Sequence, residues 1–355
     1  MFEPHFLLAL SLIPGIGPLT IQKIVSGLDE FQKLWELSPE EKRALGLRGK
    51  LPPLEEVLLR AEKEEEGLKR LGGAYVTFWD EAYPAALKEI ATPPPVLFYL
   101  GRLPQEETLL AVVGSRAATN YGLSVTRDWV AAFVRAGLGI VSGFALGIDG
   151  EAHRTVIKEG GITYAVLGCG LDVNYPAAHA SLRKEILASG GGLITEFPLG
   201  TGPRAGNFPV RNRIISGLSQ AVLVVEASPK SGSLITARLA AEQGKEVLAV
   251  PGSVFSLRSH GCHQLLREGA TLADKPEDVL NCLGYQRKET GSPELTLAPE
   301  EAKVLEHLTG EPVSVDEIAY LSGLAVEKIM PILSELEIEG LVERLPGNFF
   351  RRVRR

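Results

Sequence analysis

The chain of 355 residues is longer than a typical single domain, so we expect two or three domains. Its composition, 45% hydrophobic and 23% charged, is that of a globular chain with a substantial core and excludes an intrinsically disordered protein. The formal net charge is −7, so contact with an anionic partner requires a local cluster of cations.

Membrane and disulfide-rich classes are excluded by the apolar runs and the cysteines. Runs such as AVLVVEA (221–227) and ITYAVLG (162–168) are far shorter than the roughly 20 residues that cross a bilayer, and the N-terminus lacks a signal pattern. Cys169, Cys262 and Cys282 have no paired spacing typical of a disulfide framework or a four-thiolate zinc site. We expect a cytoplasmic protein with reduced thiols and no membrane contact.

The first domain, residues 1–73, is predicted to be helical. In LIPGIGPLTIQKIV (12–25), Gly15 and Gly17 form a tight turn just before a helix, which resembles a helix-hairpin-helix. Backbone N–H groups of such a turn can hold a DNA phosphate, but the pattern equally fits packing against a protein. The domain ends in a charge-dense helix at 54–70 with a solvated face.

The second domain, residues 74–285, has the pattern of a parallel α/β sheet. Short apolar runs are each followed by a turn and an amphipathic segment, as expected where both faces of every strand are buried. The runs are LLAVVGS (109–115), LGIVSG (138–143), ITYAVLG, GLITEF (192–197), AVLVVEA and EVLAVPG (246–252).

A polar linker is predicted at 286–295, followed by a last domain at 296–355. That domain reads as helix, turn, second helix and β-hairpin with a basic tail, which resembles a winged helix. Its second helix carries four glutamates and one lysine, so it is poorly suited to enter the major groove of DNA between phosphates. We therefore expect contact with a protein partner or a minor role in DNA binding. These residues are Glu327, Lys328, Glu335, Glu337 and Glu339.

Three turns follow strands of the central sheet, at the edge where open parallel sheets bind ligands. The first holds Ser115 and Arg116 after Gly114 and lacks the GxGxxG spacing of a dinucleotide site. The second contains Gly143 and Phe144, with Asp149 and His153 on the next helix. The third has Lys230 ahead of Ser231, Gly232 and Ser233 at a helix start. Together the turns predict a phosphate-sized cradle, although helix capping and packing explain each one alone.

An arginine-rich segment, GNFPVRNRIISGLSQ (206–220), occupies the same edge. No acidic residue interrupts it, so we expect its charges to be available to an outside anion, and Phe208 offers a ring on which a base can stack. The alternatives are that Phe208 is a core aromatic and that Arg213 forms an internal ion pair with Glu226 or Asp149. The polar residues concerned are Asn207, Arg211, Asn212 and Arg213 in this segment and Arg204 just before it.

Six motifs in this order resemble the DNA-processing protein A family, also called DprA or Smf. They are VGSR (113–116), SGFALGID (142–149), AVLGCGLDVNYP (165–176), FPVRNRIISGLS (208–219), VVEASPKSGSLITA (224–237) and VPG (250–252). The resemblance implies a Rossmann-like domain between a SAM-like helical domain and a winged helix. It also implies a homodimer that binds and protects single-stranded DNA and loads RecA onto it in natural transformation.

The resemblance implies DNA contacts at Arg116, around Gly143 and Phe144, at Phe208, Arg211 and Arg213, and at Ser231 to Ser233. With the residues argued from the sequence, the candidate DNA-binding set is Ser115, Arg116, Gly143, Phe144, Arg204, Asn207, Phe208, Arg211, Asn212, Arg213, Lys230, Ser231, Gly232 and Ser233. His263 departs from the pattern, because the family usually has asparagine at this position.

Catalytic and metal-binding interpretations are weaker. His260 and His263 lack further ligands for a metal, and Cys169 lacks a base. The alternative functions are a nucleotide-derivative hydrolase related to lysine-decarboxylase-like proteins and a nucleotide-sensing module. The hydrolase motif PGGxGTxxE matches at Thr236, but Leu239 stands where its catalytic glutamate falls. We expect no enzyme activity, no cofactor and no metal.

Overall fold

The structure is a computed structural model that describes residues 2–47, 49–105, 107–285, 297–310 and 312–352. The chain divides into two compact units, Met1–Gln286 and Arg287–Arg355. The predicted linker at 286–295 lies outside the described residues, so its boundaries stay a prediction. Within the described residues, no helix is both long and apolar enough to span a bilayer.

The first unit begins with a group of helices. Proline has no N–H, so it suits the first turn of a helix, where backbone N–H groups have no partner within the helix, and it opens α1, α2 and α4. Ser38 and Glu41 also form a capping box on α4. Leu7, Ile24 and Leu34 are buried at the centre of the group. The helices are α1 (Pro4–Ser11), α2 (Pro18–Gly27), α3 (Lys33–Glu36), α4 (Pro39–Ala44) and α5 (Leu54–Arg70).

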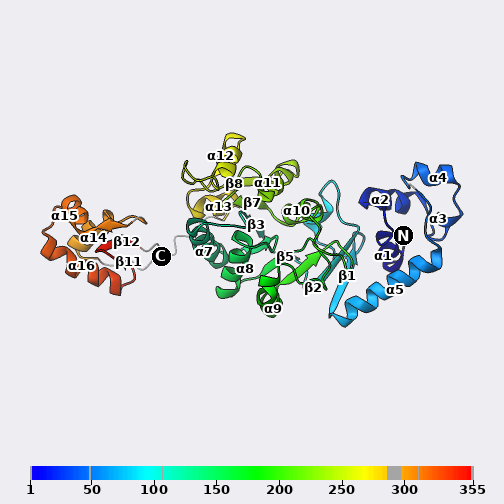
Figure 1. Ribbon diagram of the computed structural model, residues 1–355, viewed down its shortest axis with the longest axis horizontal. Coiled ribbons are helices and arrows are strands. Elements are labelled where there is room, and N and C mark those ends of the chain that lie inside the picture. The colour runs from blue at the N-terminus through cyan, green and yellow to red at the C-terminus, as the bar shows by residue number, and fades with distance from the viewer. Residues whose placement is uncertain (1, 48, 106, 286–296, 311, 353–355) are drawn as a thin grey trace. The chain divides into compact units, whose positions relative to one another are not determined.

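A nine-stranded sheet, mostly parallel, follows in the described residues, in the order β1-β2-β6-β5-β4-β3-β7-β8-β9 (Figure 1). Among the described strand pairs of this sheet, β1–β2 and β2–β6 are antiparallel and the others are parallel. The strands are β1 (Gly73–Thr77), β2 (Val96–Gly101), β3 (Leu109–Val113), β4 (Gly139–Ser142), β5 (Thr163–Val166), β6 (Gly192–Thr195), β7 (Ala221–Val224), β8 (Glu246–Ala249) and β9 (Thr271–Leu272).

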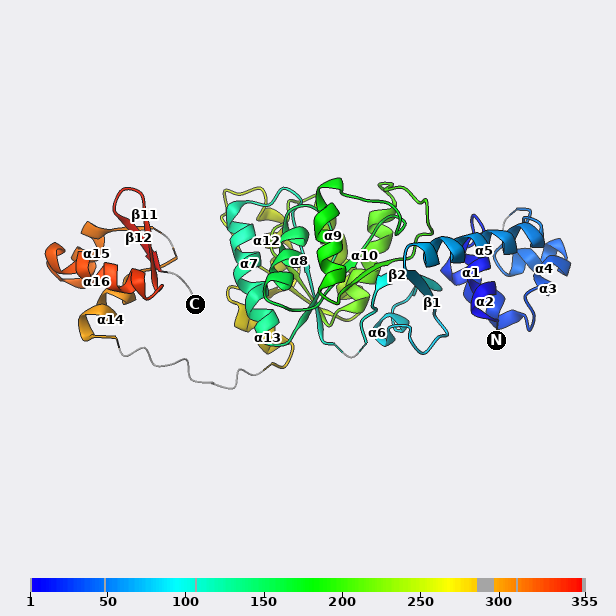
Figure 2. The same ribbon diagram turned by 90° about the horizontal axis from the view of Figure 1, so that it is seen from below.

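Helices cover both faces of this sheet, so its strands are buried on both sides. Alternate residues of β3 show the division: Ala111 packs in one core with α10 and α11, and Val112 packs in another with α7 and α8. Figure 2 shows α7, α8 and α9 side by side along one face. The helices are α6 (Ala85–Lys88), α7 (Asn120–Arg135), α8 (Ile148–Lys158), α9 (Ala180–Ala188), α10 (Asn207–Leu218), α11 (Gly232–Glu242), α12 (His260–Arg267) and α13 (Pro276–Cys282), with a 3₁₀ turn η1 (Ala177–His179). The predicted Rossmann-like α/β class is confirmed.

The strand order reverses at β3. The chain moves outward from β3 to β4, β5 and β6 on one side, then returns to place β7 and β8 on the other. At such a switch point the loops after neighbouring strands turn in opposite directions and leave a crevice at the carboxyl edge. The loops after β3 and β7 therefore flank the position where this fold binds ligands.

The second unit has the winged-helix arrangement that the sequence predicts. A three-stranded sheet, β10-β12-β11, packs with the helices around Ile318, Leu333 and Phe350. Gly323 ends α15 in a left-handed conformation (φ 66°) that favours glycine. The elements are α14 (Pro299–Glu306), β10 (Val313–Ser314), α15 (Val315–Ser322), α16 (Val326–Ile338), β11 (Val342–Leu345) and β12 (Phe349–Arg352).

Candidate nucleic-acid interface

Phe208 lies at the centre of the candidate interface, in the first turn of α10. Its ring is half-buried, and the guanidinium carbon of Arg116, from the loop after β3, lies 5.2 Å from the ring centroid. Gly168 makes room for this ring, because a Cβ there would lie 2.8 Å from Phe208 Cδ1. The Asn207 side chain donates a hydrogen bond to the Gly168 carbonyl oxygen (3.1 Å) and holds the same loop. Phe208 is therefore placed at the sheet edge and beside a cation.

Tyr175 is a residue of this site that the sequence analysis did not select. It lies in the loop after β5, is 38% exposed, and its ring centroid is 5.7 Å from that of Phe208 at an interplanar angle of 43°. The motif AVLGCGLDVNYP contains it, but nothing local in that stretch points to Phe208, which is 33 residues further along the chain. Two aromatic rings and one exposed guanidinium thus form a continuous surface.

Arg211 is buried rather than presented to solvent, with an exposed fraction of 4%. Its Nη1 donates to the carbonyl oxygens of Gly143 (2.8 Å) and Val166, which joins the loop after β4 to the end of β5. Burial lowers the pKa of Arg211 to about 10, and the nearby Asp149 carboxylate opposes this shift, so the guanidinium stays charged at neutral pH. The expectation that this charge is available to an outside anion does not hold in the structure.

Arg213 also departs from that expectation. Its guanidinium forms a two-pronged ion pair with Glu196, in which Nη2 donates to Oε2 at 2.7 Å, and its Nε donates to the Thr92 carbonyl oxygen. The alternative prediction of an internal ion pair holds, but the partner is Glu196 and neither Glu226 nor Asp149. Arg213 therefore holds α10 against the loop after β6, and its charge is compensated.

Gly143 and Phe144 do not present side-chain surface to a ligand. Phe144 is 2% exposed, and its ring packs 5.0 Å from the His179 ring in the core. A Cβ on Gly143 would lie 2.8 Å from Asp149 Oδ2, so the loop passes tightly over a buried carboxylate. Contact with a ligand at this turn is limited to the backbone, so the expected DNA contacts around Gly143 and Phe144 stay a prediction and do not involve the Phe144 ring.

The third predicted turn opens α11 at the same edge. Ser231 is the N-cap and accepts a hydrogen bond from the Ser233 backbone N–H (3.3 Å), while Ser233 itself is buried. The Asn212 side chain donates to the Gly232 carbonyl oxygen (3.2 Å), which ties this turn to α10. Lys230, just ahead of the cap, is exposed. Asn212 and Ser233 therefore support the turn, and Lys230 supplies an exposed positive charge that can contact an anion.

Burial separates the candidate cations into two groups. Arg211 and Arg213 hold the loops together, whereas Arg116, Arg204 and Lys230 are exposed at the carboxyl edge. We call the exposed cations and the two rings the sheet-edge site: Arg116, Tyr175, Arg204, Phe208 and Lys230. Cations around aromatic faces are the combination that holds the backbone and stacks the bases of a single strand.

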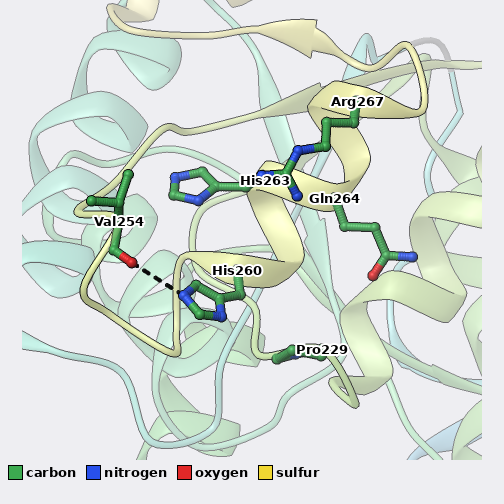
Figure 3. Close-up of a pocket in the computed structure, with 6 residues that line it drawn as sticks. All are labelled: Pro229, Val254, His260, His263, Gln264 and Arg267. Atoms are coloured by element: carbon green, nitrogen blue, oxygen red, sulfur yellow. Dashed lines mark hydrogen bonds between the residues drawn. The ribbon is translucent and has the colours of Figure 1, made fainter.

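A hollow of about 420 Å³ lies beside the third turn (Figure 3). Figure 3 shows His260, His263, Gln264 and Arg267 on α12, with Pro229 and Val254 on the neighbouring loops. The Nε2–H of His260 donates to the Val254 carbonyl oxygen (3.2 Å), and that of His263 donates to the Gly252 carbonyl oxygen (3.0 Å). His263 thus has a structural role. Among the described residues, no three His, Cys, Asp or Glu side chains group as metal ligands.

Buried acids near the site are engaged in structural contacts. Glu226 accepts hydrogen bonds from the backbone N–H and the hydroxyl of Thr119, ahead of α7. Burial raises the pKa of Asp149 to about 6, which the charge of Arg211 partly offsets. A raised carboxyl pKa is a feature of many catalytic acids, but Asp149 is 6% exposed and lies beneath the Gly143 turn. It is placed to stabilise that turn and Arg211.

Family models match both units of the chain. The model described as DNA recombination-mediator protein A matches residues 74–284, more than half of the chain. The chain belongs to this family. A second model, the DprA winged helix domain, matches residues 288–348, in agreement with the fold of the second unit.

Relatives of this family resemble the chain over most of its length. Protein Smf of Synechocystis is 34% identical over 99% of both chains, and Protein Smf of Escherichia coli is 41% identical over 76% of this chain and 75% of its own. The X-ray structure of DNA processing protein A from Streptococcus pneumoniae covers 79% of this chain and 98% of its own, with a TM-score of 0.65 and 34% identity. A structure of the Helicobacter pylori protein, described by its single-stranded DNA binding mode, covers 59% and 95%, with a TM-score of 0.52 and 29% identity.

Proposed function

We propose that the chain binds single-stranded DNA at the sheet-edge site. The observation that carries this proposal is the contact of Phe208 with Arg116 and Tyr175, at the carboxyl edge and beside the switch point of the sheet. A single strand exposes the faces of its bases and bends to bring its phosphates to the cations, whereas a duplex keeps those faces covered. The single-stranded DNA binding of the Helicobacter pylori relative supports the same ligand for this chain.

We infer the biological role from the family. As a recombination mediator, the chain would protect incoming single-stranded DNA and load RecA onto it in natural transformation, acting as a cytoplasmic homodimer. The family description as a DNA recombination-mediator protein supports the mediator role. RecA loading and dimerisation rest on the family resemblance.

The domain roles are part of the same proposal. We place the DNA-binding domain at 74–285, between helical residues 1–73 and, after a linker at 286–295, a winged helix at 296–355. In the winged helix, Lys328 of α16 pairs with Glu300 (3.2 Å), so the basic residue of that acidic helix is compensated. This favours a partner protein over a major groove as the target of α16.

The chain acts without catalysis in this proposal. Leu239 stands on α11 where related hydrolases carry their glutamate, and the nearby buried acids Glu226 and Asp149 hold backbone turns. A test is ATP hydrolysis by the purified chain. Turnover that follows the protein through every purification step would contradict this part of the proposal.

The experiment that tests the DNA proposal compares oligo-dT with a matched duplex at several salt concentrations. We expect tighter binding of the single strand, with an affinity that falls as salt rises because phosphates release counterions. Equal affinity for the two forms would contradict the proposal. Light scattering at tens of micromolar tests the homodimer, and a monomer mass would count against it.

A further inference from the structure

The N-terminal helices border a second groove that the sheet-edge site does not use. Its volume is about 660 Å³, within the range of roughly 300 to 1,000 Å³ that ligand pockets occupy. Trp35, Leu47 and Leu51 supply its apolar lining, and Lys42, Arg43 and Lys50 supply its charge. No acidic side chain is among the described residues that line it.

The charge of this groove has no acidic partner among the described lining residues, although Glu40 and Glu41 precede Lys42 on α4. Segment 42–50 contains four basic residues and no acidic one, in a chain with a net charge of −7. Lys42 donates to the Trp35 carbonyl oxygen (3.0 Å), whereas Arg43 and Lys50 are exposed and form no ion pair within the described residues. The neighbouring Glu41 carboxylate accepts the Ser38 backbone N–H (2.8 Å) and caps α4. Arg43 and Lys50 are therefore available to an anion.

Trp35 adds an aromatic ring to this lining, and its ring centroid lies 5.0 Å from that of Phe31 at an interplanar angle of 60°. Its indole Nε1–H donates to the Pro52 carbonyl oxygen (2.7 Å), which fixes the ring, and the residue is half-buried. A fixed aromatic ring beside cations is the combination on which bases stack while their phosphates are held. A nucleotide carries both a planar base and a phosphate, whereas an acidic peptide supplies only the charge.

The glycine turn before α2 is a second, independent feature beside this groove. Gly46, inside the basic segment, lies against the first turn of α2, because a Cβ on it would be 3.4 Å from Thr20 Oγ1. At the start of α2, Gly15 (φ 84°) and Gly17 have open space where a side chain would point. A strand can therefore approach the positive end of this ten-residue helix, which favours phosphate, although Pro18 has no N–H and the Thr20 N–H donates to the Gly17 carbonyl oxygen (3.0 Å).

We propose that this groove is a second binding site for single-stranded DNA, with phosphates on Arg43 and Lys50 and a base on Trp35. The turn at Gly15–Gly17 holds a further phosphate of the same strand. This site goes beyond the sheet-edge site and does not depend on it. A strand long enough to occupy both sites is held more tightly than either site holds it alone.

The test uses the full chain with Arg43→Glu and Lys50→Glu combined. We expect binding of oligo-dT of about 60 nucleotides to weaken at least about tenfold, because the bivalent contact is lost. The slope of log affinity against log salt becomes shallower by about 1.4, or about 0.7 for each lost contact. A strand of about 10 nucleotides, the size of one site, changes much less. Lys63→Glu with Arg70→Glu is the matched control, since both residues are exposed on α5, neither lines the groove, and the charge change is equal.

Photocrosslinking gives a readout that is independent of affinity. Oligo-dT carrying 5-iododeoxyuridine should crosslink to the peptide that contains Trp35, both in the parent and in a variant with Arg116→Ala and Phe208→Ala. If these two changes leave affinity intact while Arg43→Glu with Lys50→Glu abolishes it, the sheet-edge proposal fails and the groove proposal stands. Unchanged long-strand affinity in the groove variant overturns the groove proposal, and poly-glutamate binding that this variant loses would then assign the groove to a protein partner.

Discussion

The guanidinium carbon of Arg116 lies 5.2 Å from the centre of the Phe208 ring, although 92 residues separate them in the chain. Arg116 comes from the loop after β3 and Phe208 from the first turn of α10, so the contact joins a loop and a helix start at the carboxyl edge of the sheet. A cation beside an aromatic ring gives one surface that attracts a phosphate and accepts a base. The charge and the stacking of this pair can be separated by measurement.

Phe208→Ala is expected to weaken binding of single-stranded DNA through lost stacking. The cost should be about 1 to 3 kcal/mol, and the slope of log affinity against log salt should stay nearly the same because no phosphate contact is removed. Fluorescence anisotropy with oligo-dT over a salt series measures both quantities. Phe208→Tyr keeps the ring and should bind like the parent. A steep change of slope in Phe208→Ala would mean that the ring acts by positioning cations.

Arg116→Ala, Arg204→Ala and Lys230→Ala are expected to weaken binding through lost phosphate contacts. Each should make the salt slope shallower by about 0.7, because each exposed cation releases counterions from the strand. Lys158→Ala is the control: Lys158 is exposed at the end of α8, away from the loops that form the site. Parental slopes in all three site variants would remove the sheet-edge site from the DNA path.

The fold, and the location of the candidate site at the carboxyl ends of the strands, were predictable from the sequence because the patterns that indicate them are local. Continuous apolar runs such as 221–227 predict strands buried on both faces, and β7 is buried throughout. The exposure of individual arginines was not predictable. Arg211 and Arg213 stand in a segment without acids, yet Arg213 meets Glu196 and Arg211 meets Gly143 only after the chain folds. Sequence spacing does predict that Phe208 and Arg211, three residues apart, share a helix face. The guanidinium carbon of Arg211 lies 5.9 Å from the centroid of the Phe208 ring.

Arg213→Ala is expected to destabilise the fold instead of altering the salt slope. It leaves the half-buried Glu196 carboxylate, whose side chain is 12% exposed, without its partner, and breaking a fully buried ion pair costs about 3 to 5 kcal/mol, which is the upper bound here. Urea unfolding measures the change, with the exposed Arg204→Ala as the control that should unfold like the parent. A stable Arg213→Ala variant with a shallower salt slope would show instead that Arg213 turns outward to the DNA.

His153 is expected to make the stability of the first unit depend on pH. Burial lowers its pKa to about 3, reinforced by the charges of His179, Arg154 and Arg211, whereas an unfolded histidine titrates near 6.5. Between these values the unfolded chain holds a proton that the folded chain lacks, so stability is present above about pH 6.5 and is lost as pH falls. The loss approaches about 1.4 kcal/mol per pH unit.

Asp149 acts in the opposite direction within part of that window. Its folded pKa of about 6 lies above the unfolded value of 3.8, so the folded chain keeps a proton that the unfolded chain has released, and stability falls as pH rises between these values. His153→Gln should remove the contribution of His153 to the pH dependence of stability and leave that of Asp149. Relative to the parent, this variant should gain about 2 kcal/mol in its free energy of unfolding between pH 7.5 and pH 5.

Urea unfolding of parent, His153→Gln and Asp149→Asn at the two pH values measures these differences. Glutamine preserves a polar group opposite the Thr163 hydroxyl, which lies 2.7 Å from His153 Nδ1, so the comparison isolates the charge from the hydrogen bond. Asp149→Asn should gain stability relative to the parent as pH rises, the reverse of His153→Gln. If the free energies of His153→Gln and the parent change in parallel with pH, then His153 takes up its proton in the folded protein, and the core beneath the Gly143 turn is open to solvent.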